Sequence, residues 1–268
     1  MDRFDAIPGT VTARRRAAPG ATDLRGFWRG RRCPLERMTL GQLVAVFVRH
    51  PAVAAYAALI AASAVLVALL RSPAAGSLSL VAAALAAMLI YPPVEYLLHR
   101  FVLHGRFLYR SPRTVALWKR IHYDHHRDPD DLRVLFGALP TTLPTLALVT
   151  LPIGALIAGA AGAAATFGAG ALSVLVYEFV HTMQHLPYAP RRAVLRRLKR
   201  HHVLHHRHNE RGNFGIVSSL VDHLAGTYYA RASEVPRSPT TFDLGYTAAE
   251  RVRYPWLAER SEPGDPGR

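Results

Sequence analysis

The first hundred residues contain two apolar stretches that are each long enough to cross a membrane. Residues 52–70 carry no charged side chain. At about 1.5 Å per residue, a helix of this length approaches the roughly 30 Å hydrocarbon core of a bilayer. Residues 77–98 are apolar again, apart from Pro92, Pro93 and Glu95. The pattern predicts two membrane-spanning helices joined by a short turn.

A third apolar region, residues 135–180, is too long for a single span, and Glu178 is its only side chain expected to be charged at neutral pH. The glycines at 159–162 suggest a turn near its middle. We therefore predict spans at 135–158 and 163–180. The expected fold is an all-α integral membrane protein with four transmembrane helices in two hairpins.

Charge predicts the orientation of these hairpins. Half of the residues are hydrophobic, yet the formal net charge is +15, a combination expected when apolar spans alternate with basic segments. Two hairpins place the N-terminus, residues 99–134 and residues 181–268 on one face, together with the arginine-rich runs. The positive-inside rule makes that face cytoplasmic. The basic residues then set topology and contact lipid phosphates, and no nucleic-acid-binding module is recognisable.

Composition also divides the chain into domains. Residues 1–37, rich in Arg, Gly and Pro, predict a disordered basic tail, and residues 259–268 a short C-terminal tail. The intervening residues 38–258 form one membrane-embedded domain. Its histidine-rich segments, 99–134 and 181–229, are expected to cap the bundle as a cytosolic helical region.

Ten histidines occur in four clusters, and three of these clusters have the i, i+3 or i+4 spacing that places side chains on one face of a helix. Neutral imidazole is the commonest metal ligand in proteins. Ten imidazoles exceed what one ion binds, so the clusters predict two neighbouring metals. The candidate ligands are His99 and His104; His122, His125 and His126; His181 and His185; and His202, His205 and His206.

Spacing leaves the grouping of two clusters open. His99 and His104 are five residues apart and would diverge by about 140° on a regular helix. Either the helix ends between them or they serve different metals. On the last cluster, His201, His205 and His208 also share a helix face, so spacing alone does not choose between this set and the set listed above.

Acidic residues near the clusters are candidates for holding metal-bound histidines. Glu95 precedes His99 by four residues and Glu178 precedes His181 by three. Each carboxylate could accept a hydrogen bond from the second ring nitrogen of its histidine, or could instead pair with an arginine. Asp222 and His223 lie in an apolar stretch that disfavours a free charge, and they are further candidates for this role.

The order H-x4-H, H-x2-H-H, H-x3-H, H-x2-H-H around membrane spans resembles the integral-membrane fatty acid hydroxylase and sterol desaturase superfamily, and within it the fatty acid 2-hydroxylases. The resemblance lies within residues 95–229. It is carried by EYLLHRFVLH (95–104), IHYDHHRDPDDLR (121–133), YEFVHTMQH (177–185) and LKRHHVLHHRHNERGNFGI (198–216).

This resemblance implies a hydroxylase domain with two iron ions held by the ten clustered histidines. It favours His202, His205 and His206 in the last cluster, and implies no catalytic side chain beyond the ligands. O2 would be the co-substrate, and zinc could occupy the site only as a substitute without redox chemistry. The H-P-G-G motif of a fused cytochrome b5 domain is absent. We therefore expect a separate electron donor, either cytochrome b5-like or a ferredoxin with its reductase.

The function expected from these features is hydroxylation of a lipid C–H bond, at position 2 of a fatty acyl chain that is free or part of a sphingolipid. A sterol or carotenoid hydroxylase or desaturase would have the same metal ligands. A divalent-metal transporter or binding protein is the alternative from another class, but it would need polar ligands near the middle of the bilayer. A third alternative is a catalytically inactive homologue that acts as a scaffold. The Ala and Arg bias favours a bacterial inner membrane over the endoplasmic reticulum.

Overall fold

The computed structural model describes residues 34–71, 76–132 and 136–259. Within these ranges every regular element is helical, and the only β-type pairing is an isolated bridge between Pro34 and Asp131. The α-helices are α1 (Leu40–Phe47), α2 (Pro51–Leu70), α3 (Ser77–Leu97), α4 (Val115–Trp118), α5 (Asp124–Arg127), α6 (Leu139–His185), α7 (Ala193–Arg207), α8 (Leu220–Leu224), α9 (Ala248–Arg253) and α10 (Trp256–Glu259).

Shorter turns complete the helical set. Those of 3₁₀ type are η2 (Leu35–Arg37), η4 (Leu108–Arg110) and η7 (Ala232–Glu234). Two others, η3 (Leu98–Leu103) and η5 (Lys119–Tyr123), are π-helices. The π-helices directly precede or contain predicted metal ligands.

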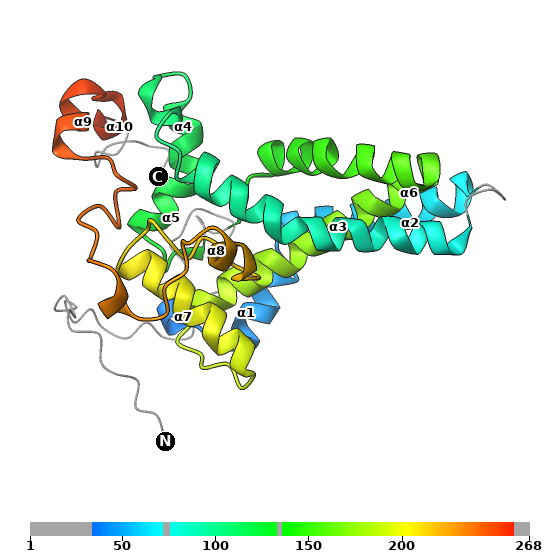
Figure 1. Ribbon diagram of the computed structural model, residues 1–268, viewed down its shortest axis with the longest axis horizontal. Coiled ribbons are helices and arrows are strands. Elements are labelled where there is room, and N and C mark those ends of the chain that lie inside the picture. Colours follow the sequence, from blue (N-terminus) through cyan, green and yellow to red (C-terminus); the bar gives the residue numbers. More distant parts are fainter. Residues whose placement is uncertain (1–33, 72–75, 133–135, 260–268) are drawn as a thin grey trace.

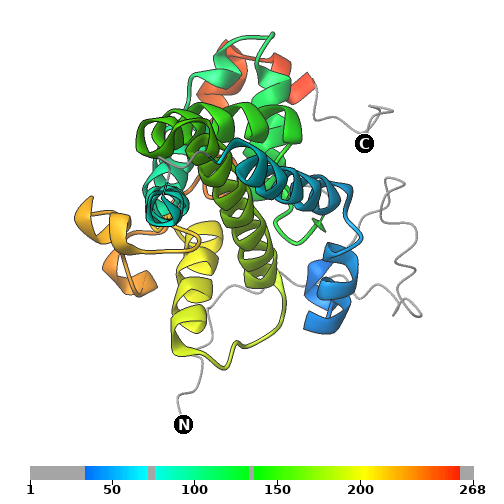
Figure 2. The same ribbon diagram turned by 90° about the vertical axis from the view of Figure 1, so that its right-hand side faces the viewer.

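Three helical segments of the described chain are long and apolar enough to cross a membrane: Pro51–Leu70, Ser77–Arg110 and Leu139–His185. The prediction of an all-α membrane protein is confirmed to this extent. Figure 1 shows α2, α3 and α6 along the long axis, with α7, α8 and α9 gathered at one end. In Figure 2, α3 and α2 lie on opposite sides of α6, and both pack against it.

The long helix α6 folds back on itself. Ala158 and Gly159 have non-helical backbone angles, and Gly159 has φ 61° and ψ −150°, a conformation that favours glycine. We call residues 139–157 the outgoing arm and residues 160–185 the returning arm. Gly154 of the outgoing arm lies against Gly162 of the returning arm, which shows that the two arms run antiparallel. The reversal falls at the edge of the predicted turn and can be followed in Figure 1.

The contact between the two arms gives a first prediction. A Cβ atom on Gly154 would collide with the carbonyl oxygen of Gly162 and the hydroxyl of Thr166. We expect Gly154→Val to lower the stability of the folded protein by about 3 kcal/mol, because the backbones would have to separate. The measurement is the melting temperature of the purified protein in detergent.

A matched control is available for this substitution. Gly76 precedes α3, and a Cβ atom there meets no atom within 4 Å. Gly76→Val should therefore melt at the wild-type temperature. Equal melting temperatures for Gly154→Val and wild type would show that the arms do not pack as described.

The N-terminal boundary of the packed chain differs from the sequence-based boundary. Leu35 is fully buried, and its amide donates to the carbonyl of Asp130 at 2.7 Å. Residues 34–37, which the sequence analysis assigned to the tail, therefore pack on the domain. They do so because burial of the apolar Leu35 side chain is favourable. The rest of both expected tails, residues 1–33 and 260–268, lies outside the described residues.

Candidate metal centre

All ten predicted histidines meet at one end of the bundle, where they form two groups of five. Within each group, each histidine has one ring nitrogen that lies within 4.8 Å of the corresponding nitrogens of the other four. We call them the first group and the second group. The first group is His99, His104, His122, His126 and His205, and the second group is His125, His181, His185, His202 and His206.

Each H-x2-H-H motif contributes to both groups. On α7, His202 and His206 are four residues apart and face the second group, whereas His205 faces the first. Successive residues on a helix point about 100° apart, so the neighbours His205 and His206 diverge. A single helix placed between two metals can therefore serve both. The motif 122–126 repeats this arrangement with the groups exchanged.

A π-helix explains how His99 and His104 come together. The helix continues from α3 as η3 to Leu103 and is capped by His104, whose amide donates to the carbonyl of His99 at 3.0 Å. This i→i+5 turn is wider than an α-helical turn, so residues five apart lie nearly above one another. The two rings have their centroids 4.9 Å apart. The alternative that they serve different metals does not fit, since both belong to the first group.

Backbone carbonyls hold the outer ring nitrogens of three histidines of the first group. The Nδ1 atom of His126 lies 2.9 Å from the carbonyl of Thr241, and that of His205 lies 2.7 Å from the carbonyl of Gly212. His99 contacts the carbonyl of Phe214 in the same way. A carbonyl only accepts, so each Nδ1 carries the proton and each Nε2 keeps its lone pair.

The inner nitrogens face one another across each group. Nε2 of His99 lies 3.1 Å from Nε2 of His122, and Nε2 of His202 lies 2.8 Å from that of His185. Both ring nitrogens of His206 are buried without a hydrogen-bond partner. Ring nitrogens that converge in this way are the arrangement that a bound cation would satisfy. The ten residues therefore fit two metal ions.

Burial keeps these imidazoles in the form that binds a metal. Desolvation lowers the pKa of His205 to about 4. It also lowers the pKa well below its usual value at His122, His126, His202 and His206, where neighbouring histidines add to the effect. The rings are therefore neutral at pH 7, and each can offer a lone pair to a metal.

The two glutamates differ from the sequence-based expectation. Oε1 of Glu95 accepts from the amide of Ile216 at 3.1 Å, and Oε1 of Glu178 accepts from the amide of Gly137 at 2.9 Å. Neither carboxylate has a hydrogen bond to a histidine or pairs with an arginine in the described chain. Helical spacing places each glutamate on the same face as its histidine. In the structure, however, each carboxylate accepts a hydrogen bond from a backbone amide of a neighbouring segment instead.

Asp222 does support the site, although through an intermediary. Its carboxylate accepts from the amides of Phe214 at 2.9 Å and Gly215 at 2.8 Å, and from the hydroxyl of Thr227 at 2.7 Å. These bonds fix the loop whose Phe214 carbonyl contacts His99. Asp222 is thus a positioning residue for the first group.

Three other candidate histidines lie outside both groups. His223, exposed at the surface, stacks on Tyr228 with ring centroids 3.7 Å apart, so its predicted role at the metals is wrong. Nε2 of His201 lies 3.1 Å from the Tyr228 hydroxyl, and Nε2 of His208 lies 2.8 Å from the carbonyl of Val235. The alternative set on α7 is thereby excluded.

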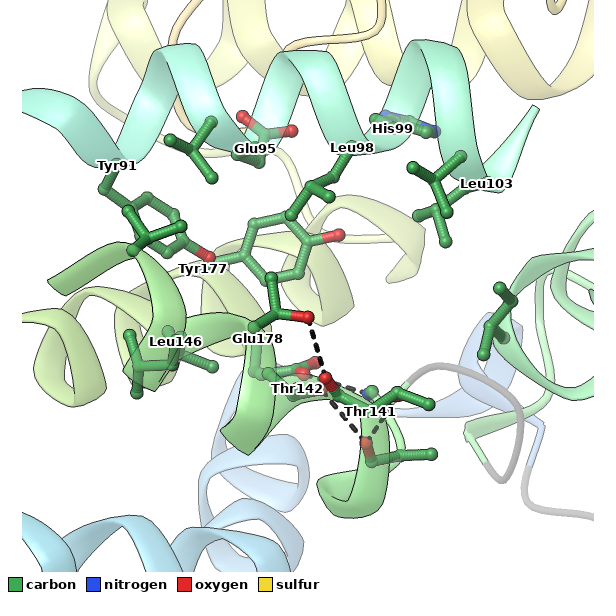
Figure 3. Close-up of a pocket in the computed structure, with 18 of the residues that line it drawn as sticks. Tyr91, Glu95, Leu98, His99, Leu103, Thr141, Thr142, Leu146, Tyr177 and Glu178 are labelled. Carbon is green, nitrogen blue, oxygen red and sulfur yellow. Dashed lines mark hydrogen bonds between the residues drawn. The ribbon is translucent and has the colours of Figure 1, made fainter. Parts of the chain in front are cut away.

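An apolar cavity of about 320 Å³ runs from the histidines into the bundle, between α3 and both arms of α6. Its wall includes His99 and His122 of the first group and His125 and His181 of the second, so it reaches both groups. Figure 3 shows Leu98 on one side of the cavity pointing towards Tyr177 on the other, with Glu95 and His99 on the same helix as Leu98 and Glu178 beside Tyr177. A flexible apolar molecule could lie here with one end at the histidines.

A second cavity, of about 210 Å³, reaches the second group from another direction. It is lined by His185 and His206 together with charged side chains, among them Lys199 and Arg207. The second group is therefore bordered by an apolar space and by one that has charged side chains in its wall.

Comparison with known proteins supports this description. A family profile described as fatty acid hydroxylase matches residues 84–227. A dihydroceramide fatty acyl 2-hydroxylase of Arabidopsis thaliana is 36% identical over 139 residues, covering 50% of this chain and 54% of the relative. A fatty acid 2-hydroxylase of Rattus norvegicus is 31% identical over 141 residues, covering 52% and 37%. The ceramide very long chain fatty acid hydroxylase of Saccharomyces cerevisiae is 31% identical over 146 residues, covering 52% and 36%.

A solved structure of full-length Scs7p, in which only the hydroxylase domain is visible, has the same fold, with a TM-score of 0.57 at 24% identity. The similarity covers 72% of this chain and 68% of that one. The chain spans about a third to just over half of the length of the curated relatives it matches. Because the family profile covers more than half of this chain and includes all ten grouped histidines, the chain belongs to the fatty acid hydroxylase family.

Proposed function

We propose that this protein is a membrane-bound di-iron oxygenase that hydroxylates carbon 2 of a fatty acyl chain with O2 and two external electrons. The observation that carries this proposal is the apolar cavity that reaches both histidine groups. It would hold a lipid chain with the carbon atoms nearest its head group at the metals. Among the relatives, several are named as fatty acid or fatty acyl 2-hydroxylases.

The metals are needed because an unactivated C–H bond does not react with any protein side chain. Two iron ions bound by the ten imidazoles would supply the oxidising power by activating O2. The protein's own contribution is to position the chain and exclude water. Carbonyls that fix Nδ1–H on His126 and His205 keep the Nε2 lone pairs directed inward.

The wall of the cavity favours a substrate with a neutral head group. No Lys or Arg lines it in the described chain, whereas Glu95 and Glu178 do, each with one buried carboxylate oxygen that has no hydrogen-bond partner. A free fatty acid would place its carboxylate near these two glutamates, and the wall offers no Lys or Arg to pair with it. An amide or ester of the acid avoids this cost, and the names of two relatives specify dihydroceramide or ceramide.

The topology that we propose has four spans, with the two arms of α6 counted separately. Both histidine groups then lie at the end of the bundle that carries α7. Its exposed Arg196, Arg200 and Arg207 favour the cytoplasmic side. Electrons would come from a separate cytochrome b5-like or ferredoxin-type donor. A bacterial inner membrane is the location that the Ala and Arg bias favours.

Lipid analysis tests the proposed function directly. Cells would express the wild type or a variant with both His125→Ala and His126→Ala, one ligand from each group, together with a reductase partner. Mass spectrometry of the hydrolysed lipids after growth under ¹⁸O2 should show 2-hydroxy acids carrying one ¹⁸O atom only with the wild type. A folded, iron-loaded wild type that yields no new hydroxy acid would contradict the proposal and redirect the search to sterols or carotenoids.

A further inference from the structure

The apolar cavity has the form of a channel along three helical arms. On α3 and η3, the residues that line it recur every three or four positions, which is one face of a helix. The outgoing arm of α6 shows the same recurrence. The lining positions on α3 and η3 include Ala87, Ile90, Tyr91, Val94, Glu95, Leu98 and His99. Those on the outgoing arm are Thr141, Thr142, Thr145, Leu146, Val149 and Thr150.

The helical rise gives the depth of this channel. The twelve positions from His99 back to Ala87 rise about 18 Å at about 1.5 Å per residue. The eleven positions from His181 back to Gly170 on the returning arm rise about 17 Å by the same measure. Two independent helices thus place the far end of the cavity at the same distance from the histidines.

Close helix packing ends the channel at that depth. A Cβ atom on Gly170 would already meet Leu146 and Thr150 of the outgoing arm at less than 3 Å. Farther along, the arms of α6 meet so tightly at Gly154 and Gly162 that a Cβ atom on either would collide with the opposite backbone. On α3, the next buried residue beyond Ala87 is Ala83, which is 0% exposed. Small residues allow helices to approach this closely and leave no room for a chain between them.

We propose that Ala87, Thr150 and Gly170 form the floor of the channel and set the length of acyl chain that is hydroxylated. This inference rests on the proposed function. A carbon–carbon bond of about 1.5 Å advances an extended chain by about 1.25 Å per carbon, so about 14 carbons fill the channel beyond the one at the metals. The preferred acyl chain therefore has about 16 carbons, and very long chains are disfavoured.

Ala87 is the position at which a larger side chain would shorten the channel. Its side chain is 1% exposed and lines the channel. Ala87→Leu adds three carbon atoms there, and we expect it to shift the preferred chain by about two carbons towards shorter acids. Thr150→Leu, from the opposite helix, should produce a shift in the same direction. Ala82 on α3 is exposed, so Ala82→Leu is the matched control with the same substitution on the other face.

The experiment supplies expressing cells with an equimolar mixture of saturated fatty acids of 12 to 24 carbons and measures the 2-hydroxy acids by mass spectrometry. We expect a maximum near 16 carbons for wild type and Ala82→Leu. Ala87→Leu should lower the ratio of 16-carbon to 12-carbon product at least fivefold while retaining the 12-carbon product. Equal products from 16 and 24 carbons in the wild type, or an equal loss at all lengths in Ala87→Leu, would overturn the inference.

A binding measurement separates this inference from the proposed function. N-acyl amides of 12 to 24 carbons are added to the purified full-length protein, and the rise in melting temperature is recorded. The rise should be greatest near 16 carbons for the wild type and at a shorter length for Ala87→Leu. A wild type without hydroxylase activity but with this length dependence would contradict the function alone. A length-independent rise would contradict the floor alone.

Discussion

We expect His202→Gln to abolish the proposed lipid hydroxylation, and the same substitution at the adjacent His201 to leave it in place. Both side chains are buried on α7, at 0% and 1% exposure. Only His202 belongs to a histidine group, whereas Nε2 of His201 lies beside the Tyr228 hydroxyl. Removal of a group that only orients a metal ligand typically costs about 10- to 100-fold in activity. Loss of a ligand itself should therefore reduce activity by about 100-fold or more. Mass spectrometry of product and elemental analysis of bound iron measure the effect.

Double variants test how the ligands are divided. His202→Gln with His206→Gln removes two ligands from the second group and leaves the first intact. We expect its iron content to fall from about two ions per chain to about one, because the second group would keep only three of its five imidazoles while the first group keeps all five. His205→Gln with His206→Gln leaves four histidines in each group and should retain more iron. Equal iron contents in the two double variants would show that the division is wrong.

The second large effect is expected at Asp222. Asp222→Ala would leave the amides of Phe214 and Gly215 and the hydroxyl of Thr227 without their acceptor in a buried loop. The cost should be roughly 3 kcal/mol or more, since each unsatisfied buried group carries a penalty of about 1–3 kcal/mol. Loss of the loop also releases the Phe214 carbonyl from His99. Melting temperature and iron content should therefore both decrease.

His223→Ala is the matched control for this loop. The side chain of His223 is exposed, and it contacts Arg197 and Tyr228 rather than a metal ligand. Its removal should leave iron content and product unchanged. Asp222→Asn should be intermediate, because the amide keeps one acceptor oxygen for the loop. If Asp222→Ala bound iron as well as His223→Ala, the positioning role of Asp222 would be refuted.

Helix content and part of the candidate ligand set were accessible from the sequence because both depend on periodicity. Uncharged runs predicted the spans, and i, i+4 spacing predicted that His181 and His185 act together, as they do in the second group. The reversal within α6 was predicted from a glycine-rich segment and lies at Ala158 and Gly159. Each of these features is determined by residues that are close together in the chain.

The features of the site that could not be predicted from the sequence depend on the local form of a helix or on contacts between segments that are distant in the chain. An i, i+5 pair looks unsuitable for one metal until the helix is seen to be a π-helix. The carbonyls of Gly212 and Thr241 that orient histidines have no sequence signal, since every residue carries a carbonyl. Glu95 was paired with His99 by spacing, whereas the amide of Ile216, more than a hundred residues away, is its partner.

The reversal in α6 bears on how the protein enters a membrane. The turn between its arms, at Ala158 and Gly159, contains no charged or strongly polar side chain, and neither do the residues on either side of it. Insertion of the two arms therefore requires no hydrophilic loop to be carried through the lipid. We expect the arms to partition into the bilayer as a preformed hairpin during synthesis, with a shallow tip that hardly emerges on the opposite side.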